Sequence, residues 1–241
     1  MLQTMITAVL APALILQGRR VRRNALELPE ASGRREGATG NGPSFRLLVL
    51  GDSAAAGVGV PTQEQALMGR LVQALGQNHT VHWRLVARSG HCLADVVRAA
   101  QGLPQEPVDL VVVSAGINDV LRGTRPARWV QGLHSLAVAL QERCSPRVVA
   151  FSGIPRIQNF PLLPQPLAWY LGRRARQFNG STRLAIPSLP ESWRVVDLDL
   201  PLTADFLARD GFHPNEAACA LWCRQVLAVA VPPQARSGGA P

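Results

Sequence analysis

Serine, histidine and aspartate side chains that together could carry out acyl transfer occur at two places in this chain of 241 residues. Ser53 closely follows the apolar run Phe45–Leu50 and lies among glycines and alanines that leave room for a substrate. A serine hydroxyl presented in such a turn can act as a nucleophile, although a serine after a strand is more often a helix cap. Asp210 and His213 are three residues apart, so the carboxylate can meet one imidazole nitrogen while the other takes a proton from a serine.

Two further residues could stabilise negative charge on a carbonyl oxygen. Gly90 follows the apolar run Val81–Ala87, and Asn118 follows Asp109–Ser114. A glycine permits a turn with positive φ that exposes its N–H, and an asparagine offers an amide donor. With the backbone N–H of Ser53, these groups would supply three donors to an oxyanion.

The elements that must position these residues alternate along the chain. Strands are predicted at Phe45–Leu50, Val81–Ala87, Asp109–Ser114, Arg147–Phe151 and Arg194–Leu198. Helices are predicted at about Thr62–Gly76, Cys92–Gln101, Pro126–Arg143, Pro166–Asn179 and Pro214–Val229. This alternation predicts a doubly wound parallel sheet with helices on both faces. Ligands of such sheets bind at the carboxyl ends of the strands, where all the candidate residues would meet.

The ordered blocks of the chain resemble those of the SGNH hydrolases, also called GDSL esterases or lipases, over about residues 45–230. The matching blocks are Gly51-Asp52-Ser53, Gly90, Gly116-x-Asn118-Asp119 and Asp210-x-x-His213. The chain departs from the family's name motif at Ala54, where the family has leucine. Because that position is not catalytic, the departure concerns the shape of the pocket rather than the chemistry.

The resemblance implies a three-layer α/β/α fold around a flavodoxin-like, five-stranded parallel sheet. It implies that Ser53 is the nucleophile, that His213 is the general base and that Asp210 orients His213. The N–H groups of Ser53 and Gly90 and the side chain of Asn118 would form the oxyanion hole. No metal and no cofactor are implied, and the partner would be a small-molecule carboxylic ester.

The expected activity is that of a serine esterase acting on short to medium acyl chains. A lysophospholipase or thioesterase is a first alternative, favoured by the apolar N-terminus and the arginines. A carbohydrate acetyl esterase is a second, because the five tryptophans could stack on sugars, although the chain has one tyrosine. From another class, a noncatalytic membrane-associated protein with this fold is also considered.

The composition excludes several mechanisms. The chain contains no lysine, so all 25 basic side chains are arginine, and chemistry that needs a lysine amine is excluded. The net charge of +9 suggests an anionic partner or reflects nucleotide bias in a GC-rich genome. Because nucleic-acid binding would rest on charge alone, it is not expected. The four cysteines lack zinc-site spacing and are predicted to be buried free thiols.

The ends of the chain differ from its centre. Residues 1–28 form an apolar-basic segment: residues 1–16 carry no charged side chain, and the sequence GRRVRR follows. A helix there could bind an anionic membrane surface or pack on the core or on a partner. Residues 29–44 read as a linker, 45–231 as the hydrolase domain and 232–241 as a disordered tail. No secretory signal is recognised, which favours a cytoplasmic or peripheral membrane location.

The proline-rich stretch from Ile154 to Asn179 leaves from the carboxyl edge of the predicted sheet. It could form a wall of the acyl pocket or a lid that faces lipid, because apolar and arginine-rich surfaces lie next to each other in it. A core helix with a solvated basic face explains the same pattern.

Overall fold

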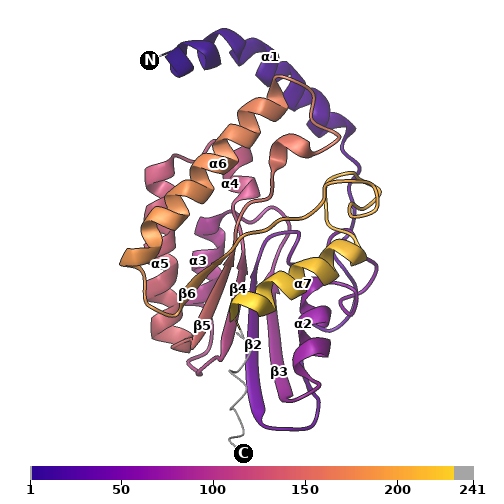
Figure 1. Cartoon of the computed structure of the whole chain (residues 1–241), viewed down its shortest axis with the longest axis vertical. Helices are drawn as coiled ribbons and strands as arrows, with labels where there is room; N and C mark the ends of the chain where they lie inside the picture. Colours follow the sequence, from indigo (N-terminus) through magenta and orange to yellow (C-terminus); the bar gives the residue numbers. More distant parts are fainter. Residues whose placement is uncertain (1, 231–241) are drawn as a thin grey trace, which may run out of the picture.

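A six-stranded sheet in the order β1-β3-β2-β4-β5-β6 forms the centre of the computed structural model, which describes residues 2–230 (Figure 1). Its strands are β1 (Glu36–Thr39), β2 (Ser44–Gly51), β3 (Thr80–Ala87), β4 (Leu110–Ser114), β5 (Val148–Ser152) and β6 (Trp193–Val196). Strands β2 to β6 are parallel, and their order confirms the flavodoxin-like arrangement. The order in which strands are added to the sheet reverses at β2, because β3 lies on one side of it and β4 on the other.

Helices cover both faces of the sheet and confirm the three-layer fold. The helices are α1 (Leu2–Asn24), α2 (Leu67–Leu75), α3 (Leu93–Gln101), α4 (Ile117–Leu121), α5 (Pro126–Cys144), α6 (Leu167–Ala185) and α7 (Glu216–Ala230), with 3-10 turns at Ile157–Asn159 and Ile186–Ser188. Figure 1 shows α2 and α7 on one face and α3, α5 and α6 on the other. Leu47 and Val49 of β2 pack toward α2 and α7, whereas Leu48 and Leu50 pack in the opposite layer. Burial on both faces explains why these strands are almost continuously apolar.

The expected linker over residues 29–44 differs from the structure, because it contains β1. This strand pairs antiparallel with the outer edge of β3, so the sheet has six strands rather than the expected five. All four residues of β1 are exposed or half-buried. An edge strand held by backbone hydrogen bonds needs no apolar pattern, so residue types did not predict this strand. The expected tail at 232–241 lies outside the described residues.

Helix α1 packs against the body of the molecule near the start of α6 (Figure 1). The amide of Gln17 donates a hydrogen bond to the carbonyl of Gln165 at 2.7 Å and accepts one from the N–H of Leu167 at 3.1 Å. The second bond satisfies a donor at the first turn of α6 that has no partner within that helix. Leu14 is buried in the core beside α6. Across residues 2–230, no helix has the length and apolar character needed to cross a membrane.

Candidate active site

Ser53, His213 and Asp210 lie in a chain of short hydrogen bonds at the carboxyl edge of the sheet. Ser53 Oγ is 2.8 Å from His213 Nε2, and His213 Nδ1 is 2.6 Å from Asp210 Oδ2. Each imidazole nitrogen therefore has one partner, so Nδ1 can carry the proton toward the carboxylate while Nε2 accepts from the serine. This arrangement can activate a serine hydroxyl for attack on a carbonyl carbon.

The turn that carries Ser53 is fixed by the buried side chain of Asp52. Its Oδ1 accepts hydrogen bonds from the hydroxyl of Ser114 at 3.1 Å and from the N–H of Ala54 at 3.2 Å. Burial raises the pKa of Asp52 from 3.8 to about 6, although these bonds oppose the shift. Because Ser114 ends β4, the carboxyl group ties the turn after β2 to the neighbouring strand.

The loop before α7 brings His213 to the serine. Ala208 N–H donates to the carbonyl of His213 at 2.8 Å, and Asp210 Oδ1 accepts from the N–H groups of Phe212 and His213, each at 3.0 Å. Burial raises the pKa of Asp210, but the hydrogen bonds from the His213 imidazole and from the two backbone N–H groups outweigh it and lower the pKa overall. The carboxylate is thus held in its charged form beside the imidazole.

Gly90 and Asn118 line the same cavity as Ser53 and His213. Gly90 has φ of +82°, the conformation that its sequence position suggested. The amide of Asn118 donates one hydrogen bond to the carbonyl of His91 at 2.9 Å, and an amide has a second N–H to offer. Within residues 2–230, the backbone N–H groups of Ser53 and Gly90 donate to no protein acceptor. All three expected donors are therefore available beside the serine.

Asp119 fixes α4, the short helix that carries Asn118. Its carboxylate accepts from the N–H of Leu93, the first residue of α3, at 2.9 Å and from the hydroxyl of Thr124 at 3.2 Å. Burial raises the pKa of Asp119 despite these bonds. The side chain therefore caps α3 and holds α4 in place at once.

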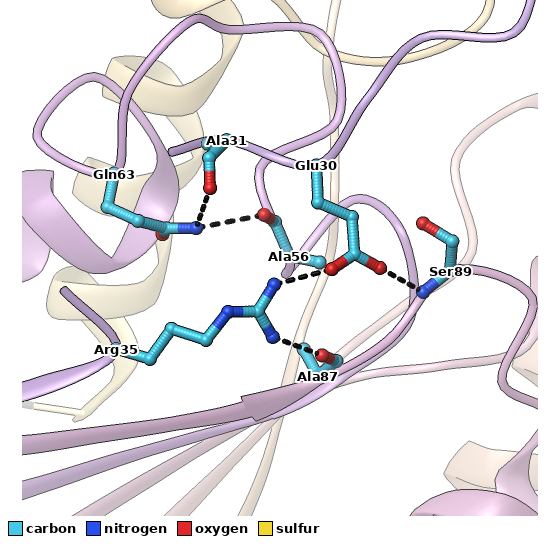
Figure 2. A network of polar contacts seen from close by, with 7 residues as sticks. All are labelled: Glu30, Ala31, Arg35, Ala56, Gln63, Ala87 and Ser89. Atoms are coloured by element: carbon cyan, nitrogen blue, oxygen red, sulfur yellow. Dashed lines mark hydrogen bonds and ion pairs between the residues drawn. The ribbon is translucent and has the colours of Figure 1, made fainter. Parts of the chain in front are cut away.

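A polar network that the sequence did not indicate supports the Gly90 turn (Figure 2). Glu30 Oε1 accepts from the N–H of Ser89 at 2.6 Å, and Glu30 Oε2 forms an ion pair with Arg35 at 2.5 Å. Arg35 also donates to the carbonyl of Ala87, the last residue of β3, at 2.7 Å. Both side chains come from the stretch that was expected to be a linker, and their partners include backbone groups, so residue types alone could not reveal them.

Figure 2 also shows how the same stretch is attached to the turn after Ser53. The buried amide of Gln63 donates to the carbonyls of Ala31 at 3.2 Å and Ala56 at 3.0 Å. Ala31 N–H donates to the Ala56 carbonyl at 3.3 Å. Residues 30–35 therefore connect the serine turn to the Gly90 turn.

Two cavities meet at the serine. An apolar one of about 60 Å³ is lined by residues that include Ile154, Phe160 and Trp222. A larger cavity of about 860 Å³ is lined by Leu162 and by residues of α1. Both include Ser53, Asn118 and His213 in their walls. The proline-rich stretch after β5 thus contributes to both cavities.

The cysteines and the metal-ligating residue types do not form a second reactive site within residues 2–230. All four cysteines are free and buried, as predicted. Burial raises the pKa of Cys219 to about 12 and that of Cys223 to about 11, so these thiols are poor nucleophiles. Among residues 2–230, no three His, Cys, Asp or Glu side chains gather where they could hold a metal ion.

Comparison with known proteins places this site in context. Residues 49–221 match the model of the GDSL-like lipase/acylhydrolase family. A solved structure described as TesA is 25% identical, with a TM-score of 0.58, covering 75% of this chain and 95% of its own. A search of curated proteins finds no match.

Two more distant structures share the fold. The psychrotrophic esterase EstA from Pseudoalteromonas sp. is 22% identical with a TM-score of 0.54, covering 75% of this chain and 93% of its own. The acetylxylan esterase Axe2 from Geobacillus stearothermophilus is 18% identical with a TM-score of 0.52, covering 77% and 94%.

Proposed function

Because the chain belongs to the GDSL-like lipase/acylhydrolase family, we propose that it is a serine esterase that hydrolyses carboxylic esters through Ser53, His213 and Asp210. The observation that carries the proposal is the continuous hydrogen-bond chain from Ser53 Oγ through His213 to Asp210, with distances of 2.8 and 2.6 Å. A noncatalytic protein of this fold would have no need to keep all three groups aligned.

The first half of the reaction forms an acyl-enzyme. His213 Nε2 takes the hydroxyl proton as Ser53 Oγ attacks the ester carbonyl carbon. Asp210 stabilises the imidazolium that forms. The N–H groups of Ser53 and Gly90 and the amide of Asn118 donate hydrogen bonds to the tetrahedral oxyanion. His213 then protonates the leaving alcohol, and the C–O bond to that alcohol breaks.

The second half releases the acid. His213 takes a proton from water, whose oxygen attacks the acyl-enzyme carbonyl, and the same donors hold the second oxyanion. His213 returns the proton to Ser53 Oγ as the acid leaves. Because two cavities meet at Ser53, the acyl and alcohol parts of an ester can occupy separate spaces. Short to medium acyl esters are the proposed substrates, and lysophospholipids or thioesters are the alternative.

The test is hydrolysis of a p-nitrophenyl ester series, from acetate to palmitate, by wild type and Ser53→Ala. We expect turnover by wild type and none above background by Ser53→Ala, with both proteins equally stable to heat. Turnover that survives Ser53→Ala would overturn the proposal. Failure of the folded wild type on these esters, on lysophospholipids and on acyl thioesters would favour the noncatalytic alternative.

An anionic membrane surface is a proposed partner of α1. Val9 and Leu16 are 80% and 70% exposed, and Arg19, Arg20, Arg22 and Arg23 follow on the same helix. None of these arginines forms an ion pair with a carboxylate of residues 2–230. Exposed apolar side chains beside unpaired basic ones suit the interface of an anionic bilayer.

Flotation with liposomes tests the membrane proposal. Wild type should float with vesicles of phosphatidylglycerol and phosphatidylcholine but not with phosphatidylcholine alone, and Leu16→Asp should float less. Equal flotation of wild type and a variant with Arg20 and Arg23 changed to glutamate would contradict the proposal.

A further inference from the structure

The larger cavity at the serine has α1 as its outer wall. Its volume of about 860 Å³ lies within the range of cavities that hold sizeable small-molecule ligands. The proposed catalytic Ser53 and His213 line it together with residues of α1 and of the segment that follows α1. The space next to the nucleophile is therefore continuous with the space under the N-terminal helix.

One face of α1 supplies this wall. The helix residues that line the cavity recur at helical spacing and are Ala11, Leu14, Ile15, Gly18, Arg19, Val21 and Arg22. Apolar side chains from the body of the molecule also line the cavity: Leu121 of α4, Leu162 and Leu163 of the stretch before α6, and Tyr170 of α6. An extended apolar group could therefore contact carbon atoms on two sides along the groove.

Gly18 lies in the middle of this wall and adds no side chain to it. A Cβ atom at Gly18 would meet no other atom within 4 Å, so no neighbouring side chain requires a glycine there. A glycine inside a helix costs about 1 kcal/mol relative to alanine. Because Gly18 is among the residues that line the cavity, we expect a larger residue there to reduce the volume available to a ligand.

We propose that the groove under α1 binds the acyl chain of the substrate, and that Gly18 determines how long a chain can enter. The proposal rests on the esterase function proposed above and specifies its substrate, within the short to medium range, as esters of unbranched medium-length acyl chains. In this arrangement the ester carbonyl lies at Ser53, and the acyl chain of the substrate runs between α1 and the leucines at positions 121, 162 and 163. Because the family match begins at residue 49, this wall belongs to a part of the chain that the family model does not cover.

Three substitutions at Gly18 of the full-length chain test the proposal. Gly18→Ala, Gly18→Leu and Gly18→Trp add increasing volume at a position where a Cβ atom meets no other atom within 4 Å, and melting temperatures check that each variant folds. The matched control is Ala13→Trp, because Ala13 lies on α1, is exposed and does not line the groove. Each variant is assayed on p-nitrophenyl acetate and p-nitrophenyl laurate.

We expect kcat/KM for laurate to fall progressively as the side chain at position 18 becomes larger, by at least tenfold for Gly18→Trp. Leaving two methylene groups of the acyl chain in water instead of burying them already corresponds to about that factor. The value for acetate should stay at the wild-type level in every Gly18 variant. Ala13→Trp should leave both values unchanged. An identical chain-length profile for Gly18→Trp and wild type would overturn the proposal.

A binding measurement separates this inference from the proposed function. Calorimetric titration of dodecanoate into Ser53→Ala, with and without Gly18→Trp, needs no turnover. Binding that is lost on Gly18→Trp and kept on Ala13→Trp supports the groove even if no ester is hydrolysed. Turnover of acetate without measurable binding of dodecanoate, or equal binding by both variants, would leave the esterase intact and refute the groove.

Discussion

Ser89 N–H donates a 2.6 Å hydrogen bond to Glu30 Oε1, which ties the residue directly before Gly90 to a segment outside the family match (Figure 2). Gly90 is one of the proposed oxyanion donors, so the orientation of its N–H depends on how the turn is held. Glu30 is itself held by Arg35, which also bonds to the end of β3. The carboxylate is thus a positioning group for the proposed oxyanion hole.

Glu30→Ala should lower kcat by roughly 10- to 100-fold with little change in KM, since small misplacements of a catalytic group have effects of that order. Glu30→Gln keeps an oxygen that can accept from Ser89 N–H and should recover part of the loss. The measurement is steady-state hydrolysis of p-nitrophenyl acetate by both variants, with heat denaturation as the control for folding. Equal kcat values for wild type and a folded Glu30→Ala would rule out the positioning role.

Asp52 should give the protein a distinct dependence of stability on pH. Its folded-state pKa of about 6 is above the usual 3.8, so between these values the folded state holds a proton that the unfolded state has released. The free energy of unfolding should therefore fall as pH rises from about 4 to 6, by about 3 kcal/mol from this group. Asp52→Asn does not ionise and should lack this contribution.

The measurement for Asp52 is urea denaturation of wild type and Asp52→Asn at several pH values from 4 to 7. Other carboxylates titrate equally in both proteins, so the difference between the two curves isolates Asp52. The variant should gain stability relative to wild type as pH rises. Parallel curves would show that the carboxyl group has an ordinary pKa.

Asp210→Asn should lower kcat by roughly 10⁴-fold, because an amide in that place favours the wrong imidazole tautomer. The amide oxygen can still accept from the N–H groups of Phe212 and His213, so the loop should keep its shape. Hydrolysis rates and the melting temperature, taken together, check this. A folded variant with more than a tenth of the wild-type rate would mean that Asp210 does not orient the base.

Most of the sheet was predictable because its parallel strands are buried on both faces. Each of the five predicted strands overlaps a strand of the structure, and the residues expected at the carboxyl edge lie there together. Ser53 and His213 are 160 residues apart in sequence. They could be predicted to lie together because the carboxyl ends of parallel strands meet at one edge of the sheet.

What could not be predicted depends on backbone partners and on exposed elements. Strand β1 pairs through its backbone and shows no apolar alternation. Glu30 acts through the N–H of Ser89, a contact that residue types do not encode. The apolar N-terminal sequence fits a membrane surface, the protein core or a partner, and residue types do not encode the bonds that Gln17 makes with backbone groups of Gln165 and Leu167.

Asn118→Ala tests the side-chain donor proposed for the oxyanion. Removing one such donor costs roughly 100- to 1,000-fold in kcat, since its hydrogen bond strengthens as the oxygen becomes charged. KM should change little because the ground-state carbonyl bonds weakly. Loss of the bond to the His91 carbonyl should also cost about 1 kcal/mol of stability, so rates are compared well below the melting temperature. A near-normal kcat in the folded variant would leave the two backbone N–H groups as the whole oxyanion hole, whereas a rise in KM alone would assign Asn118 to substrate binding.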